Sequence, residues 1–402
     1  MTRAQQPGQA SDQRAAAGAL AVLRLVHGRP GVSRSDVARM LGMSTSSTTE
    51  ITARLRARGL LTERAPDGAR HRGRPSGLLL PHPDGPVVCA VEITHAGWRV
   101  AAVELGGAVV SELEGRRART ADVALREIGR GVAELSDDLG SRIRAIGVSI
   151  TGTVSGRRLV QGATLRWREA DLGAVVPDVL RHLPFAAGND ATLAGLAEAR
   201  RGAAVGASVV LYLAVDVGIG GVVVADGQPL VGALGEGGEF GHMPLGSLGL
   251  SCPCGATGCW DMEVDGRALA RALGRRAPAS PRAFAERSIA AARAGASAEA
   301  AAVADVVRAL GRGTGALVNA LDPDLVVYGG LAPGLRAAAP GVLEPAYRDA
   351  LMRHRRSDPP PIVASALERD GALLGAAERA FDLVLTPSLL SGTDVHARSQ
   401  AG

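Results

Sequence analysis

The chain has 402 residues, which is enough for two or three domains and a large hydrophobic core. Apolar residues make up 46% of it but aromatic residues only 2%, so the core must be packed from Ala, Val, Leu and Ile. The sequence has no apolar run of about 18 residues, which excludes a transmembrane helix, and its polar start, residues 1–11, lacks the apolar segment of an export signal, so we expect a cytoplasmic protein.

Charge is divided unevenly along the sequence. Residues 1–82 contain 13 arginines and 5 acidic residues, a net charge of +8, whereas the whole chain carries +5, which leaves −3 for residues 83–402. A basic segment ahead of a mildly acidic body indicates that a polyanion binds to the N-terminal part only.

Residues 15–58 have the pattern of three helices. Apolar side chains recur on one helical face between residues 15 and 27, and Ser33 and Ser44 are suitable N-caps for the second and third helices. Gly42 supplies the tight turn between these two helices. This arrangement predicts a helix-turn-helix unit.

The third helix is predicted to read DNA. Residues near its N-terminus normally meet base edges, and arginines further along suit phosphates. Glu50 lies among the exposed N-terminal positions, and Arg56 and Arg58 follow in the second half. The residues assigned to DNA contacts are Ser44, Thr45, Ser46, Thr49 and Arg54.

A hairpin is expected after this helix, with strands at residues 60–64 and 77–80. The loop between them, residues 70–75, reads Arg-His-Arg-Gly-Arg-Pro and resembles the wing of a winged helix, with Arg72 and Arg74 entering the minor groove. The alternative is a solvated basic loop on a protein-interaction module. We therefore predict a winged helix-turn-helix DNA-binding domain at residues 1–82.

Prolines at positions 81, 83 and 86 predict a short, stiff linker through which movements of the body would reach the DNA-binding domain. The body, residues 83–385, is expected to be α/β, strand-rich at first and then alternating between helix and strand. It contains a strand at 209–215 followed by a glycine loop, and a closing helix at about 370–381. No internal repeat is evident, and residues 386–402 are expected to form a disordered tail.

Three of the four cysteines lie within eight residues. Cys252, Cys254 and Cys259 follow His242 in a glycine-rich segment, and one imidazole with three thiolates is a four-ligand set for a closed tetrahedral zinc site. The alternative is a pair of local disulfides with a core histidine, which a reducing cytosol disfavours. We expect one structural zinc ion per chain, held by these four residues.

The E-x-G-H turn at Glu239–His242, followed by C-x-C-G-x-x-G-C at 252–259, resembles the ROK family of repressors, open reading frames and sugar kinases. The resemblance extends upstream through the glycines of residues 218–235 and covers about residues 86–385. It implies a two-lobed, actin-like ATPase fold of the ribonuclease H type, with a ligand cleft between the lobes.

The resemblance also implies a sugar pocket. In family kinases the aspartate of the N-D-A motif is the general base, and Asp190 stands at that position; the alternative for this pair is an Asn-Asp helix cap. Thr151 and Thr164 replace residues usual in the family, which leaves the particular sugar open. The implied sugar-binding residues are Asn189, Asp190, Glu239, His242 and Asp261.

The phosphate-binding turn departs from the family. Its kinases have D-x-G-G-T in the first hairpin, whereas residues 92–96 here read Glu-Ile-Thr-His-Ala, and side chains at Thr94 and His95 would keep a phosphate away from the backbone. Val222 further weakens the second glycine loop, and simple packing explains the third, at residues 326–330. No catalytic residue and no kinase activity are therefore expected.

These observations predict a DNA-binding transcriptional regulator of the ROK type, a repressor whose cleft binds a sugar or a sugar phosphate. Reading two half-sites requires a homodimer or a higher homo-oligomer. Two alternatives remain: an active sugar kinase that also binds DNA, and a regulator whose zinc responds to metal or redox state.

Overall fold

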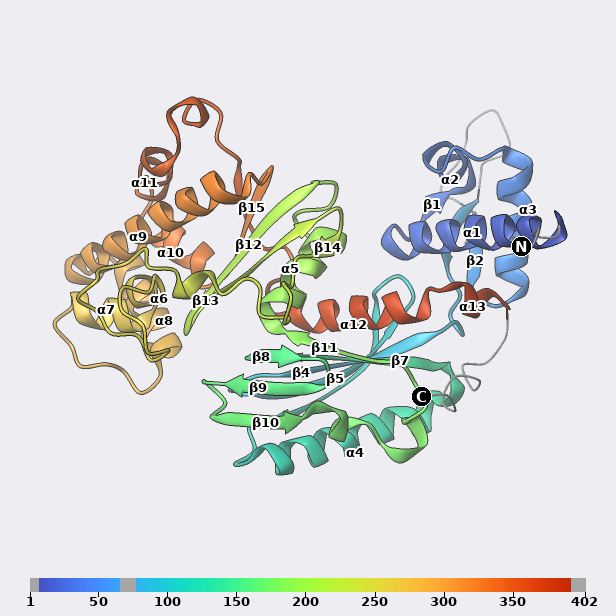
Figure 1. The fold of residues 1–402 in the computed structure, drawn as a ribbon, viewed down its shortest axis with the longest axis horizontal. Coiled ribbons are helices and arrows are strands. Elements are labelled where there is room, and N and C mark those ends of the chain that lie inside the picture. Colours follow the sequence, from blue (N-terminus) through green and yellow to red (C-terminus); the bar gives the residue numbers. More distant parts are fainter. Residues whose placement is uncertain (1–6, 66–76, 392–402) are drawn as a thin grey trace, which may run out of the picture.

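The structure, a computed structural model, describes residues 7–65 and 77–391. It is an α/β protein with an N-terminal helical module and two lobes, each built on a five-stranded sheet (Figure 1). The predicted fold class is therefore confirmed. None of the described helices combines the length and the apolar character needed to cross a membrane.

The N-terminal module has three helices and a small antiparallel sheet. Its Ser33 and Ser44 cap the second and third helices as predicted, because their hydroxyl oxygens accept bonds of 3.1 Å from the amides of Asp36 and Ser47. The sheet has the order β1-β3-β2, and its first strand was not predicted. The elements are α1 (Pro7–Gly28), β1 (Val32–Ser33), α2 (Arg34–Met40), α3 (Thr45–Ala57), β2 (Leu61–Arg64) and β3 (Leu78–Pro81).

The first lobe is built on a sheet with the order β11-β7-β4-β5-β6. An antiparallel β4–β5–β6 meander occupies one side, and β7 and β11 add to it in parallel. One face is covered by α4 (Ala121–Leu139), and a second small sheet, β8–β10, lies beside it. The strands are β4 (Val87–Ile93), β5 (Gly97–Glu104), β6 (Val109–Arg116), β7 (Ile143–Ile150), β8 (Thr153–Ser155), β9 (Arg158–Gly162), β10 (Trp167–Asp171) and β11 (Phe185–Asn189).

The second lobe repeats this topology. Its sheet has the order β14-β13-β12-β15-β16, again with two antiparallel pairings followed by two parallel ones, although no internal repeat is evident in the sequence. Its strands are β12 (Val209–Asp216), β13 (Gly218–Ala225), β14 (Gln228–Pro229), β15 (Leu325–Gly330) and β16 (Ile362–Ala364). Its helices are α6 (Asp261–Val264), α7 (Gly266–Ala272), α8 (Pro281–Arg293), α9 (Ser297–Leu321), α10 (Ala332–Ala338) and α11 (Leu343–Ala350).

Two helices, α5 (Asp190–Arg201) and α12 (Gly371–Val384), pack against each other between the lobes (Figure 1). Gly375 allows this close approach, because a Cβ there would lie 2.0 Å from the backbone oxygen of Leu193 on α5. Helix α12 also lies on the first lobe's sheet, against β4 and β7.

The N-terminal module is docked on the body through a shared core. Leu20, Leu23 and Val26 of α1 are fully or almost fully buried in one cluster with Leu373 and Phe381 of α12. The packing therefore runs across the predicted boundary at residue 82 without a break. The linker alone does not hold the two parts together.

The prediction of a tail from residue 386 is wrong for its first residues. Residues Pro387–Ser391 form α13, and the half-buried Leu389 and Leu390 pack against the same core as α1. Apolar residues that find a partner surface fold onto it, although the local sequence is short and gives little helical signal. The rest of that segment lies outside the described residues.

Candidate functional site

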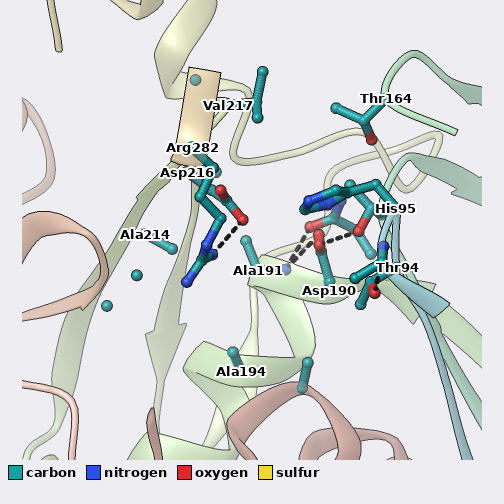
Figure 2. A pocket seen from close by; sticks show the side chains of 18 of the residues that line it. Thr94, His95, Thr164, Asp190, Ala191, Ala194, Ala214, Asp216, Val217 and Arg282 are labelled. Carbon is teal, nitrogen blue, oxygen red and sulfur yellow. Dashed lines mark hydrogen bonds and ion pairs between the residues drawn. The ribbon is translucent and has the colours of Figure 1, made fainter. Parts of the chain in front are cut away.

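A cleft of about 1370 Å³ separates the two lobes. It is lined by residues from β4, β11, β12, β13 and α8, and Figure 2 shows part of this lining. All five predicted sugar-binding residues line it, although they come from three separate segments of the chain. These five are Asn189, Asp190, Glu239, His242 and Asp261.

Asn189 has the role of the helix cap that was the alternative for this motif. Its amide oxygen accepts bonds from the backbone amides of Ala191 (2.9 Å) and Thr192 (3.1 Å), and its amide nitrogen donates to the carbonyl of Gly152 (3.0 Å). Capping thus fixes the start of α5 and leaves this side chain little capacity for a ligand.

Asp190, the first residue of α5, is half-buried in the cleft. Its Oδ2 accepts a 2.7 Å bond from the hydroxyl of Thr151, and its Oδ1 accepts one of 2.9 Å from the amide of Ala191 (Figure 2). Burial, together with the charges of Asp216 and Glu92, raises the pKa of Asp190 to about 6. In the sequence, Thr151 was noted only because it replaces a residue usual in the family, and its contact with Asp190 was not predicted.

Asp261 and Glu239 lie on either side of the imidazole of His242. Asp261 is buried and accepts a 2.6 Å bond from the amide of Ile219, so one of its oxygens fixes the glycine loop at the start of β13. Its other oxygen lies 3.7 Å from His242 Nδ1, and an oxygen of the exposed Glu239 lies 3.8 Å from His242 Nε2. Gly218 stands next to this carboxylate with φ of +106°, where any Cβ would meet it at 2.7 Å.

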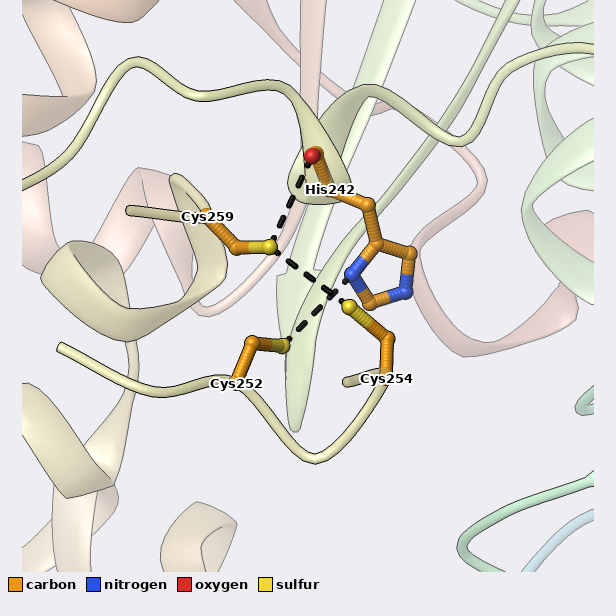
Figure 3. A group of neighbouring side chains, drawn as sticks. All are labelled: His242, Cys252, Cys254 and Cys259. Atoms are coloured by element: carbon orange, nitrogen blue, oxygen red, sulfur yellow. Dashed lines mark hydrogen bonds between the residues drawn. The ribbon is translucent and has the colours of Figure 1, made fainter. Parts of the chain in front are cut away.

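The four predicted metal ligands converge (Figure 3). Their ligand atoms all lie within 4.8 Å of one another, with 3.6 Å between the sulfurs of Cys254 and Cys259 and 3.7 Å between Cys252 Sγ and His242 Nδ1. A tetrahedral zinc ion with Zn–S bonds of about 2.3 Å separates its sulfurs by about 3.8 Å, so the cluster has the dimensions of such a site. A disulfide requires about 2.05 Å, and all four cysteines of the chain are free.

The three thiols differ in how readily they ionise. The backbone amide of Ala256 lowers the pKa of Cys254, whereas burial raises the pKa of Cys252 and of Cys259. Metal binding would drive both buried thiols to the thiolate form.

The turn of the first hairpin uses its own hydrogen-bonding groups. The amide of Thr94 donates to the carbonyl of Gly97 (2.8 Å), and the amide of Ala96 donates to the Thr94 hydroxyl (3.2 Å). Glu92 pairs with Arg99 at 2.7 Å, both side chains being buried. Two amides of the turn are thus already engaged, and the carboxylate beside it is paired with Arg99.

Other polar groups of the cleft were not foreseen. Arg282 of α8 pairs with Asp216 at the end of β12, at 2.8 Å (Figure 2). The remaining oxygen of Asp216 and the hydroxyl of Thr164 are buried without a hydrogen-bond partner among the described residues. Asp216 and Arg282 are 66 residues apart, and their meeting has no local sequence signal.

The exposed face of α3 carries the residues predicted to contact DNA, except those of the loop. Ser44, Thr45, Ser46, Thr49 and Arg54 are all exposed. Ser44 is engaged as the N-cap, and Arg56 pairs with Glu63 of β2 at 3.1 Å, so neither is free in this structure. Arg72 and Arg74 lie outside the described residues.

At the ends remote from the cleft, α5 and α12 hold the N-terminal module through a buried charged cluster. The guanidinium of Arg201, at the end of α5, pairs with Glu378 of α12 and donates to the backbone oxygens of His27 (3.1 Å) and Gly106 (2.6 Å). His27, the penultimate residue of α1, has its Nε2 3.3 Å from Glu378 and its ring 4.5 Å from that of Phe381.

The charge of Glu378 is held in this cluster although the side chain is only 3% exposed. Burial by itself raises the pKa of Glu378, but His27, Arg201 and Arg200 outweigh it and lower the value to about 2. The carboxylate therefore stays ionised and paired at the joint between the module and the body.

Comparison with known proteins matches two parts of the chain to two families. The profile described as the ROK family matches residues 88–382, and that described as the MarR family matches residues 16–72. The glucokinase of Streptomyces coelicolor is 29% identical over 263 residues, covering 60% of this chain and 81% of the glucokinase. The xylose repressor of Caldicellulosiruptor bescii is 24% identical over 335 residues, covering 77% of this chain and 82% of the repressor.

A solved structure was found that matches nearly the whole chain. It is a ROK family transcriptional regulator described as a homologue of the E. coli MLC protein, and it covers 94% of this chain and 100% of its own, with a TM-score of 0.75 and 21% identity. This likeness confirms the predicted fold of a winged helix followed by a two-lobed body.

Proposed function

We propose that this chain, which belongs to the ROK family, is a DNA-binding transcriptional repressor that a saccharide bound in the cleft releases from its operator. One observation carries the proposal: α5 begins with Asp190 in the cleft and ends with Arg201 on the helix that opens the DNA-binding module. A single rigid element thus joins a ligand site to a recognition module. Such a regulator works in the cytoplasm.

Double-stranded DNA is the proposed partner of the N-terminal module. Its net charge of +8 and the exposed face of α3 support this, and the xylose repressor among the relatives is a regulator by name. The contacts assigned to α3 come from Thr45, Ser46, Thr49 and Arg54, with Ser44 holding the helix start, and Arg72 and Arg74 are assigned to the minor groove. Two modules are needed for two half-sites, so we infer a homodimer.

The cleft is proposed to bind a saccharide. Asp190 supplies a strong acceptor for a ligand hydroxyl, and Glu239 and His242 lie within reach of the same cavity. The unpartnered oxygens of Thr164 and Asp216 support this assignment, because buried polar atoms are normally hydrogen-bonded and a polyhydroxylated ligand would satisfy them. Asp261 and Asn189 contribute chiefly by fixing the glycine loop and the start of α5.

We propose that the chain has no sugar kinase activity, although glucokinases are among its relatives. The amides of Thr94 and Ala96 are bonded within the turn, and Glu92 is bound to Arg99, so this hairpin offers little to a phosphate. The alternative, an active kinase, predicts ATP-dependent phosphorylation of a hexose that Asp190→Asn abolishes.

A structural zinc ion, one per chain, is the proposed occupant of the His242–Cys252–Cys254–Cys259 cluster. It would hold the loop that carries Glu239 at the cleft wall, with no part in chemistry, because four protein ligands leave no open position. A regulator that senses metal or redox state at this cluster is the remaining alternative.

The link between ligand and DNA is proposed to run through α5 and α12 together. At the cleft, Arg99 joins the hairpin of the first lobe to the start of α12 through Asp370 (2.6 Å) and the carbonyl of Arg369 (2.8 Å). At the other end, the carboxylate of Glu378 lies beside the imidazole of His27, and Arg201 donates to the backbone oxygen of His27. Closure of the lobes on a ligand would therefore shift the surface of α5 and α12 on which α1 packs. A coupling free energy of a few kcal/mol between ligand binding and DNA binding is enough to release the operator.

The proposal is tested by binding of labelled operator DNA titrated with a panel of saccharides, wild type against Asp190→Ala. We expect DNA affinity without sugar to be nearly equal in both proteins and release by sugar to be blunted in the variant. An equal response to sugar in both would show that Asp190 is not part of the sensor.

The DNA contact is tested by Arg72→Ala/Arg74→Ala. The variant loses two cationic side chains near the DNA phosphates. Binding should therefore weaken, and the plot of log affinity against log salt should become less steep by up to about 2. The matched control is Arg126→Ala/Arg130→Ala on α4, which removes the same charge from an exposed face of the first lobe. Equal affinity and slope in the wing variant and in the control would remove the loop from the interface.

A further inference from the structure

We propose that Glu50 reads a cytosine in the operator and determines the base preference of α3. The inference rests on the proposed function, because it requires that the N-terminal module binds duplex DNA. It adds a specificity-determining residue and a base identity that the fold alone does not supply.

Helix α3 has one buried and one exposed stripe. The buried stripe is made of Thr48, Ile51, Thr52 and Leu55. On the exposed side, Ser46, Glu50 and Arg54 follow one another at intervals of four residues, so their side chains lie in a row along the helix. The side chain of Glu50 is 74% exposed and lies in the N-terminal half, which in a helix-turn-helix faces the bases.

Most of the hydroxyl groups around Glu50 are already engaged with α3 or with its N-cap. Ser44 Oγ accepts the amide of Ser47 and lies 3.0 Å from Ser46 Oγ, and Thr49 donates to the carbonyl of Thr45 at 2.8 Å. By contrast, among the described residues the carboxylate of Glu50 has only a loose partner, Arg54 Nη2 at 4.0 Å. Glu50 is therefore the group in these two turns with the most free hydrogen-bonding capacity and the longest reach.

The usual readers of guanine and adenine are missing from this part of the helix. Residues 44–53 contain no Arg, Lys, Asn or Gln. The base-reading half of α3 thus offers short hydroxyl side chains and one carboxylate. Whatever base preference this half has must come mainly from that carboxylate.

An ionised carboxylate only accepts hydrogen bonds. In the major groove, guanine presents N7 and O6 and thymine presents O4, which are all acceptors and repel it. Adenine has a donor at N6, but its acceptor N7 lies beside it, whereas cytosine presents the N4 amino group alone. Cytosine is therefore the base that Glu50 favours.

The negative charge of Glu50 is tolerable near DNA because Arg54 follows one turn later, beside the phosphates. The two other acids of the module whose side chains the structure describes are placed differently. Glu63 is only 15% exposed and binds Arg34 and Arg56, and Asp36 pairs with Arg39 on α2. Glu50 is the one acidic residue of α3.

The experiment is selection of bound duplexes from a random pool by the full-length protein, compared for wild type, Glu50→Gln, Glu50→Ala and the control Asp36→Asn. For the wild type we expect one position of each half-site to be cytosine, with replacement there weakening binding by about fivefold or more. Glu50→Gln should change the preferred base to adenine, because a glutamine amide matches adenine N6 and N7. Glu50→Ala should lose the preference at that position only, and Asp36→Asn should keep the wild-type pattern.

Three results overturn the proposal: a wild-type half-site without a fixed cytosine, a Glu50→Gln pattern equal to wild type, or the same change of pattern in Asp36→Asn. Thermal unfolding tests whether each variant is folded. Because these substitutions are at exposed positions, the unfolding temperature should stay unchanged. Failure of the wild type to enrich any duplex would instead contradict the proposed function itself.

Discussion

The two ends of the helix pair α5 and α12 differ in how their charged groups are held. At the module end, the buried Glu378 and His27 and the nearly buried Arg201 bind one another across three elements. At the cleft end, Asp190 of α5 faces a large cavity together with Asp216 of β12, and one oxygen of Asp216 has no partner among the described residues. The same two helices thus end in a closed joint on one side and in an open site on the other.

This difference separates two tasks that a ligand-controlled DNA-binding protein has to combine. A joint whose charges satisfy one another keeps its geometry whatever the solvent contains, because breaking it leaves a charge buried and unpaired. In the open site, hydrogen-bond acceptors are still free, so its free energy falls when a ligand donates hydrogen bonds to them. Ligand binding at the open end can therefore move the joint as a unit.

The strongest challenge to this comparison is removal of one member of the joint. Glu378→Ala leaves Arg201 without a carboxylate partner among the described residues, whereas Arg200 keeps its pairing with Asp382 at 2.9 Å, and we expect the free energy of unfolding to fall by about 3–5 kcal/mol in urea titrations. The control is Glu134→Ala on α4, an exposed carboxylate, with a change within about 0.5 kcal/mol. A loss below about 1 kcal/mol for Glu378→Ala would mean that the joint is held by its apolar contacts alone.

The cleft wall near the metal cluster should respond more locally. Cys254→Ser is expected to reduce bound zinc from about one ion per chain to a small fraction and to increase hydrogen exchange in residues 239–259, while the two lobes stay folded. Cys89→Ala removes a buried thiol far from the cluster in sequence and should keep the metal. Full zinc occupancy in Cys254→Ser would exclude Cys254 from the ligand set.

The smallest effect is expected from Asp190→Asn. Because the folded-state pKa of Asp190 is raised to about 6 from an ordinary 3.8, the native state holds its proton more tightly than the unfolded state, and wild-type stability falls as the pH rises between these values. The asparagine variant does not titrate, so its stability relative to wild type should be higher at pH 8 than at pH 5. Thermal unfolding at both pH values measures this, and a difference independent of pH would contradict the raised pKa.

The sequence predicted those features whose signals are local. Ser33, Gly42 and Ser44 mark helix boundaries within a few residues, and the E-x-G-H turn with its cysteines is one continuous segment. The cleft residues could be predicted because each belongs to a motif whose spatial neighbours the family resemblance supplies. Without that resemblance, Asn189-Asp190 was only a helix cap, and in the structure Asn189 is indeed one.

The features that were missed depend on contacts between distant segments. Arg201 and His27 are 174 residues apart, and Arg282 and Asp216 are 66 apart, so nothing in the neighbouring sequence of one residue points to the other. The shared topology of the two lobes escaped notice for a similar reason: pairing order is preserved by backbone geometry, and many different apolar side chains fill the same layer. The short helix α13 forms because α1 offers it a surface.

The shared core between α1 and α12 limits how a DNA-binding domain of this architecture can be transferred from one regulator to another. Leu20, Leu23 and Val26 have their partners on a helix some 350 positions later in the chain, so a graft of residues 1–82 onto another body would expose an apolar face on both pieces. A workable chimera must carry the matching surface of α12 and α13 with it. In this protein the DNA-binding module therefore packs as one unit with the last helices described, although the two lie at opposite ends of the chain.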